Sequence, residues 1–303
     1  MRRIVLSIVL LAVTLSGRRA EAADAVTLKW KLKTGDTFYL ENVQKMKQTI
    51  TVMGREVKQS TTQTAFTQFS VKKELPDGGA VIEQTILKIS NPENKPGSAG
   101  AKISENMKGV KFTITLNSKH NVVKFEGYDE FIKKVTDGNK AVAMALRSMM
   151  SKETMQKTAS EAFSQLPGKS VSTGDMWNRS NNLSMGPIGN MAVTAIYEYV
   201  GNAKVDGKPV ERITYVAVVK YSPPKADENS NLPFTIAKGD LKSDSFSGTI
   251  HFDPKSGRSV DSVTQMKISG DLTYLIQGKT RVVSLKQNMK IEVRVLDKNP
   301  LDK

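Results

Sequence analysis

Alternation of apolar and polar residues dominates the chain after about its first 25 residues. It is clearest near the C-terminus, where apolar residues occupy nearly every second position from Val283 to Val295 and polar residues lie between them. A period of two is typical of a strand with one buried and one solvated face. Similar alternation begins at Leu28 and returns in several later segments. The pattern predicts antiparallel sheet for most of the chain.

The period changes in the middle of the chain. Apolar residues there fall at i, i+3, i+4 and i+7, which is one face of a helix: Tyr128, Phe131, Ile132 and Val135. Helical spacing then continues to Leu166, and Pro167-Gly168 ends it. We therefore predict a mainly β protein of the α+β class. Its first β unit occupies residues 23–126, a helical segment residues 127–167, and a second β unit residues 168–303.

Four turn landmarks recur in the same order in the two β units, at similar offsets. We interpret them as an internal duplication that gives two tandem antiparallel curved-sheet units, with the helices packed between or against them. The alternative is one large sandwich whose similar turns carry no such meaning. The paired landmarks are Gly35-Asp36 with Gly174-Asp175, Asp77-Gly78 with Asp206-Gly207, residues 88–92 with 220–224, and Asn117 with Asp253.

Two stretches lack any period, residues 91–109 and 222–240. Both are rich in turn-forming or polar residues. We predict long mobile loops at equivalent ends of the two units.

The N-terminus has the pattern of a secretory signal peptide at residues 1–22. A basic Met1-Arg2-Arg3 head precedes an apolar run from Ile4 to Leu15 and a small-residue exit at Ala20–Ala23. The run is shorter than the roughly 20 residues that span a bilayer, and no later segment is long and apolar enough to do so. The sequence predicts export to the periplasm or to the outside of the cell, with no transmembrane segment in the mature chain.

Composition narrows the chemistry. The chain has no cysteine, which excludes disulfides and thiolate sites, and its two histidines, His120 and His251, have no metal-ligand partner at i+2 or i+4. We therefore expect no metal site and no cofactor. The formal net charge of +15 favours an anionic envelope ligand such as a lipid headgroup, although it also serves solubility. Export and the lack of a basic-aromatic motif argue against nucleic acid.

No nucleophile elbow, phosphate-cradling loop or dinucleotide fingerprint is present, so no catalytic residue is assigned. Asp36 and Asp175 are the acids within the repeated motif. A Gly-Asp pair at a strand entry is usually a turn whose carboxylate accepts backbone N–H bonds. The alternative hypothesis is a carboxylate-dependent hydrolase of envelope glycans, because paired acids meet only in three dimensions.

Four methionines cluster in the helical segment: Met144, Met149, Met150 and Met155. Flexible thioethers can form an adaptable apolar surface, so we regard these residues as a candidate ligand-binding stripe. Packing between helix and sheet is the competing interpretation.

The segment Leu166-Pro167, Val171, Gly174-Asp175 and Trp177 resembles a family of uncharacterised exported bacterial β-rich proteins. The resemblance covers most of the mature chain and implies no activity. At the level of fold, a curved sheet backed by helices also looks like the lipoprotein-carrier and lipid-binding half-barrels of the bacterial envelope. The sequence thus favours an exported, non-enzymatic envelope protein that binds an apolar or amphiphilic ligand or a partner protein.

Overall fold

The computed structural model describes residues 25–184, 188–224, 234–276 and 278–302. The predicted signal peptide, residues 1–22, lies outside them. The elements in chain order are β1 (Val26–Thr27), β2 (Thr37–Val52), β3 (Arg55–Glu74), β4 (Ala80–Ser90), α1 (Ala99–Met107), β5 (Lys111–Leu116), β6 (Val122–Glu126), α2 (Tyr128–Val135), α3 (Lys140–Met149), α4 (Lys152–Ser164), β7 (Ser170–Val171), β8 (Met176–Ser184), β9 (Asn190–Val205), β10 (Lys208–Ser222), β11 (Thr235–Asp253), β12 (Arg258–Ile276) and β13 (Lys279–Leu296).

The long strands form one antiparallel sheet of 11 strands in the order β6-β5-β4-β3-β2-β13-β12-β11-β10-β9-β8, while β1 and β7 pair separately. The predicted α+β class, mainly β with helices, is confirmed. The two β units are not separate sheets, because β2 pairs with β13 from Tyr39–Leu296 to Val52–Val283. Both strands carry apolar residues at alternate positions, so their pairing extends one apolar face across both units.

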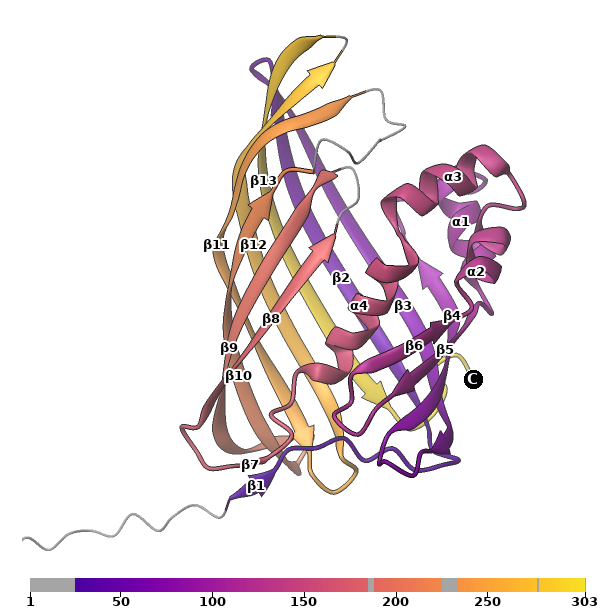
Figure 1. Cartoon of the computed structure of the whole chain (residues 1–303), viewed down its shortest axis with the longest axis vertical. Helices are drawn as coiled ribbons and strands as arrows, with labels where there is room; N and C mark the ends of the chain where they lie inside the picture. The colour runs from indigo at the N-terminus through magenta and orange to yellow at the C-terminus, as the bar shows by residue number, and fades with distance from the viewer. Residues whose placement is uncertain (1–24, 185–187, 225–233, 277, 303) are drawn as a thin grey trace, which may run out of the picture.

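The sheet is strongly curved, and α4 lies in the opening between its two edge strands (Figure 1). The Ser160 hydroxyl accepts a bond from the Val122 amide at the β6 edge, at 3.4 Å. At the β8 edge, the Trp177 indole donates to the Gln165 carbonyl and Arg179 Nε donates to the Ser164 carbonyl, at 2.8 and 2.7 Å. The helix therefore ties together edges that would otherwise be unpaired.

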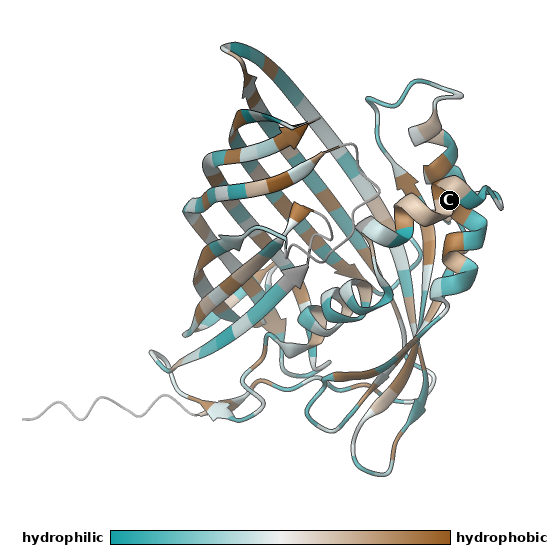
Figure 2. Cartoon of the chain, turned by 45° about the horizontal axis from the view of Figure 1, so that its top comes forward, coloured by the Kyte–Doolittle hydropathy of each residue, from teal (hydrophilic) through white to brown (hydrophobic). Residues whose placement is uncertain are grey.

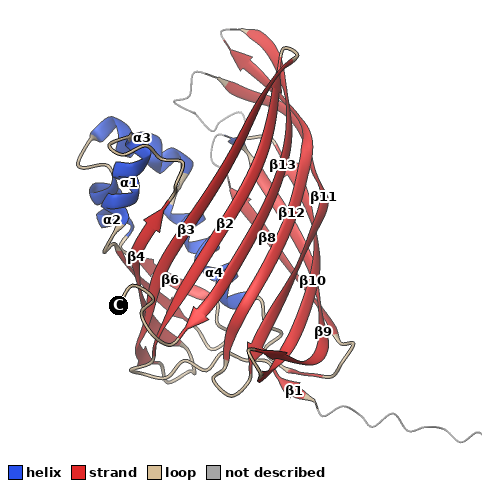
Figure 3. Ribbon diagram, turned by 180° about the vertical axis from the view of Figure 1, so that it is seen from behind, coloured by secondary structure: helices blue, strands red, loops and turns tan. Residues whose placement is uncertain are grey.

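The segment between β1 and β2 crosses one end of the curved sheet (Figure 1), and Figure 3 shows the same end, marked by β1, from behind. Trp30 packs edge-on against Phe163 and Phe252, with ring centroids 5.5 and 6.3 Å apart, and its indole donates to the Phe163 carbonyl. The Lys31 amide donates to the Gly257 carbonyl. Leu28 is fully buried in the core beneath this end. These contacts close that end with the chain itself.

The two Gly-Asp motifs form matching turns. Gly35 and Gly174 have φ angles of 93° and 91°, a conformation that glycine adopts at little cost. Their amides donate to the Val71 and Tyr199 carbonyls, at 2.9 and 2.8 Å. The other three landmark pairs also lie at corresponding strand ends, since β2–β6 and β8–β12 run in the same order. The arrangement agrees with the duplication interpretation.

One of the two predicted loops is wrong in part. Residues 91–109 contain helix α1, which packs against β4, so the stretch is not a loop throughout. Ser98 caps the helix by accepting a bond from the Ala101 amide, and this local signal outweighs the nearby proline and glycines. In the second stretch, residues 225–233 lie outside the described residues, and β11 already begins at Thr235.

Candidate ligand-binding face

The two faces of the central strands differ in charge. Residues that are register partners in an antiparallel sheet lie on the same face. We call the face that carries Phe38 the inner face and the opposite one the outer face. Between residues 38–52 of β2, 283–295 of β13 and 262–274 of β12, every charged side chain belongs to the outer face. These outer-face residues are Glu41, Lys45, Lys47, Lys267, Asp271, Lys286, Lys290, Glu292 and Arg294.

A continuous apolar row crosses the inner face from the β8 edge to the middle of the sheet. Its members are register partners or near neighbours on successive strands, and we call the row the inner belt. It consists of Trp177, Tyr197, Tyr215, Phe246, Met266, Met289 and Met46. The alternating hydropathy of these strands is visible in Figure 2.

The first part of the inner belt is aromatic. The Trp177 ring stacks on Tyr197 with centroids 5.6 Å apart, and Tyr197 lies 5.0 Å from Tyr215. The Tyr215 and Thr264 hydroxyls share a hydrogen bond, with their oxygens 2.6 Å apart. The Tyr215 ring lies directly over Gly248, its register partner on β11. Burial raises the pKa of both tyrosines, so they stay protonated and uncharged at neutral pH.

The second part of the inner belt is a run of three methionines on adjacent strands. Met46 is the register partner of Met289, which is the partner of Met266. All three are only half-buried, although they lie at the centre of the sheet. The helices contact the sheet mainly at β4, β6 and β8. The three thioethers therefore form an apolar surface that the chain covers incompletely.

Uncharged polar groups flank the methionines on the same face. Gln44 Nε2 lies 3.0 Å from the Met289 sulfur. Asn42 and Gln48 follow the same parity on β2, and Thr61 is the register partner of Met46. Amides and hydroxyls can hydrogen-bond a ligand without bringing a charge to the apolar surface. The inner face thus suits a molecule that is mostly apolar with some polar groups.

The methionines singled out from the sequence lie elsewhere. Met144 on α3 is 57% exposed and Met150, just after that helix, is 37% exposed. Met155 on α4 packs against the core of the first β unit. Met149 lies in α3, and its side chain is outside the described part. The proposed stripe remains a prediction, whereas the inner belt comes from strands that the sequence analysis did not align.

Asp36 and Asp175 have the same local role. Asp36 Oδ2 accepts from the Lys33 amide at 3.2 Å, and Asp175 Oδ2 accepts from the Ser172 amide at 2.8 Å. Each carboxylate thus closes its own turn next to a Gly-Asp strand entry. This geometry favours the structural role for both acids over the catalytic one.

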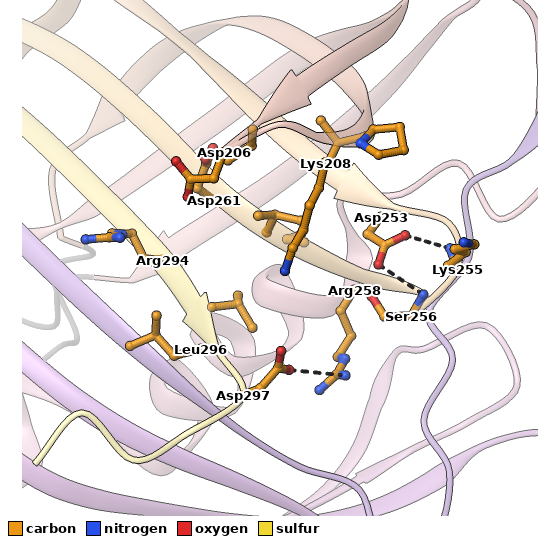
Figure 4. A pocket seen from close by; sticks show the side chains of 16 residues that line it. Asp206, Lys208, Asp253, Lys255, Ser256, Arg258, Asp261, Arg294, Leu296 and Asp297 are labelled. Atoms are coloured by element: carbon orange, nitrogen blue, oxygen red, sulfur yellow. Dashed lines mark hydrogen bonds and ion pairs between the residues drawn. The ribbon is translucent and has the colours of Figure 1, made fainter. Parts of the chain in front are cut away.

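A cavity of about 480 Å³ lies outside this face, between the β9–β10 turn, the β11–β12 turn and the end of β13 (Figure 4). Its charges are mixed and partly paired, as in Arg258–Asp297 at 3.7 Å. Burial opposes ionisation of Asp253, but bonds from Ser256 and Lys255 lower its pKa overall. The Asp253 carboxylate therefore holds the turn and is not poised to accept a proton at neutral pH.

The two histidines lie far apart in the topology. His251 on β11 pairs with Asp261 on β12, with Nδ1 and Oδ1 2.7 Å apart, and His120 lies in the β5–β6 turn. Within the described ranges, no three or more histidine and acidic side chains gather where they could hold a metal ion. None of the helices in these ranges has the length and apolar character that crossing a bilayer requires.

Residues 59–258 match the model of DUF6263, described as a family of unknown function, and the chain therefore belongs to that family. The resemblance to an uncharacterised β-rich family is confirmed. No curated protein matches the chain.

Several solved structures are similar over most of their length, each at 10% identity. One is a "putative exported protein with YmcC-like fold" from Bacteroides fragilis, which has a TM-score of 0.26 and covers 86% of this chain and 97% of its own. Another is DynF of the dynemicin biosynthesis pathway from Micromonospora chersina, which has a TM-score of 0.17 and covers 89% of this chain and 85% of its own. A third is an outer membrane channel from Pseudomonas putida, which has a TM-score of 0.20 and covers 88% of this chain and 98% of its own. At such low scores these likenesses carry no functional argument.

Proposed function

We propose that the protein is exported and binds the apolar part of an amphiphile, such as an acyl chain, on the inner belt, without catalysing a reaction. The observation that carries this proposal is the half-buried methionine run Met46–Met289–Met266, on a face that carries no charge along the central strands β2, β13 and β12. Unbranched thioethers adapt to chains of variable length and shape. Large apolar surfaces that a protein leaves uncovered commonly mark binding sites.

The surroundings of the methionines support the same ligand class. The aromatic part of the inner belt continues the apolar surface toward the β8 edge, and its tyrosines are neutral. The flanking amides can bond to ester or hydroxyl groups. A fully ionic ligand would lose its hydration over the methionine run without gaining a counter-charge there, which is costly. The N-terminal pattern at residues 1–22 supports an address in the cell envelope or outside the cell, where such ligands occur.

A matched pair of variants tests the proposal. Met289 and Asn288 are neighbours on β13 that point to the inner and outer faces, so Met289→Glu and Asn288→Glu add the same charge on opposite sides. The full-length protein is purified without detergent, extracted with organic solvent, and the extract is analysed by mass spectrometry. Defined lysophospholipid is then titrated into the stripped protein.

We expect wild-type protein to bind the lysophospholipid and Met289→Glu to weaken binding at least about tenfold, because a carboxylate would be desolvated under the acyl chain. Asn288→Glu should change binding less than about twofold, since that charge faces solvent. Wild-type protein that neither carries nor binds an amphiphile contradicts the proposal. So does an equal loss in both variants, with circular dichroism confirming that both are folded.

A further inference from the structure

A second cavity lies where α4 meets both edges of the sheet, and we call it the seam cavity. It has a volume of about 570 Å³, within the range of small-molecule sites. Three segments far apart in the sequence line it: the crossing segment before β2, the β5–β6 turn, and β8 with the end of α4. The Leu166-Pro167 segment, which follows α4 and opens the motif noted in the sequence, forms part of the wall.

The charge of the seam cavity is of one sign. Lys29, Lys119 and Arg179 line it, and the described lining residues include no aspartate or glutamate. Within the described chain, the two lysines form no ion pair. Arg179 donates only to neutral carbonyls, those of Ser164, Leu166 and Asn178. Three positively charged residues, two of them exposed lysines, therefore line one cavity without a carboxylate among the described lining residues, in contrast to the paired charges of the outer face.

His120 adds a neutral group to the same wall. It is only 8% exposed and has a φ of 58°, in a turn where Asn117 Oδ1 accepts bonds from the Lys119 and Asn121 amides. Burial lowers the pKa of His120, and the positive charge of Lys29 lowers it further. The imidazole is therefore neutral at pH 7 and can donate one N–H bond.

Hydroxyl and amide groups complete the lining. Ser160 and Ser164 of α4 lie on one side, and Asn121 and Asn181 lie near the sheet edges. The carbonyls at the C-terminus of α4 would repel an anion, but Arg179 bonds the Ser164 carbonyl and the Trp30 indole bonds the Phe163 carbonyl. The cavity thus offers hydrogen-bond donors from several segments in a positively charged lining. A phosphate group carries up to two negative charges and three strong acceptor oxygens, so it can accept bonds from donors on several of these segments at once.

We infer that the seam cavity binds a phosphate group, held by Lys29 and Lys119 with His120 and the serine hydroxyls as further donors. The group is either a free phosphate compound or the phosphate of a lipid headgroup. This assignment stands independently of the amphiphile proposal, because it rests on a different surface and a different set of residues.

The test uses two probes and two matched double variants. Lys29→Gln with Lys119→Gln removes two charges from the seam cavity, and Lys47→Gln with Lys267→Gln removes two from the outer face, where both lysines are exposed. Binding of inorganic phosphate is followed by the NMR titration of His120. Binding of vesicles containing phosphatidylglycerol in phosphatidylcholine is measured by sedimentation.

We expect phosphate to raise the pKa of His120 in wild-type protein, because an anion stabilises the imidazolium. The seam variant should bind phosphate at least about tenfold more weakly, as expected for the loss of charge-assisted bonds, and the outer-face variant should stay within about twofold of wild type. Vesicle binding that falls only in the seam variant identifies a lipid headgroup. Phosphate binding without vesicle binding identifies a free phosphate compound.

The inference is overturned if saturating phosphate leaves the pKa of His120 unchanged in wild-type protein. It is also overturned if both double variants lose phosphate or vesicle binding equally, because general attraction to a basic protein would then explain the result. Wild-type secondary structure in both variants shows that the comparison is between folded proteins.

Discussion

The inner and outer faces of the sheet are built from the same strands but have opposite chemistry. On the outer face, Lys290 pairs with Glu292 at 2.7 Å and Lys45 lies 4.0 Å from the same carboxylate. Such exposed pairs contribute little to stability, so the outer face serves mainly as a solvated boundary. The inner face has no charge along the central strands, yet its methionines are not fully buried. This partly uncovered apolar face is the basis of the proposed binding site.

The contrast weakens over β8–β10. There the outer face also carries exposed apolar side chains: Met176 at 62%, Ile196 at 44%, Val216 at 59% and Val218 at 64%. The central strands therefore show the two faces most cleanly. Neighbouring residues on one strand, one for each face, give matched pairs of variants that test the contrast directly.

The largest difference in stability between an inner-face and an outer-face substitution is expected at the start of β8, between Trp177 and Met176. Trp177 is 8% exposed, stacks on Tyr197 and donates to the Gln165 carbonyl, so Trp177→Ala should lower the free energy of unfolding by about 3–5 kcal/mol. Met176 is mostly exposed, and Met176→Ala should change the free energy of unfolding by less than about 0.5 kcal/mol. Urea unfolding followed by circular dichroism measures both. Equal losses would mean that the two faces are not distinct at this edge.

A smaller difference in stability is expected on β11, between substitutions at Gly248 on the inner face and Ser247 on the outer face. A Cβ on Gly248 would lie 2.5 Å from the Tyr215 ring, which Thr264 holds by a hydrogen bond. Gly248→Ala must therefore displace that ring and should cost about 1–3 kcal/mol. Ser247→Ala, on the outer face, should stay within about 0.5 kcal/mol of wild type. Thermal unfolding gives the values, and near-ultraviolet circular dichroism should report the moved tyrosine in the first variant alone.

Much of this fold could be predicted from local patterns. The alternation of apolar and polar residues predicted the strands, and the helical spacing of apolar residues predicted α2–α4. The two Gly-Asp motifs predicted the matching turns. Trp177 could be recognised as a structural residue because it follows one of those turns. These features depend on residues close together in the sequence, whose geometry is set by local backbone and side-chain preferences.

The binding face could not be predicted in the same way. Met289 falls within the alternating run from Val283 to Val295, but its position beside Met46 depends on β2 pairing with β13, which lies far along the chain. Register between distant strands is set by the whole sheet and cannot be read from one segment. The seam cavity likewise joins Lys29, Lys119 and Arg179 from three segments. A cluster of methionines along the helical sequence was visible, whereas the one across the strands was not.

The most direct measurement locates the ligand on one face. The chain has no cysteine, so Met289→Cys and Asn288→Cys each give a single attachment point for a small fluorophore, on the inner and outer faces respectively. Lysophospholipid with a doxyl spin label on its acyl chain is then added below its micelle concentration. If the amphiphile binds the inner belt, quenching should be strong and saturable at position 289 and weak at position 288. Equal quenching at both positions, or none at position 289, would contradict the account.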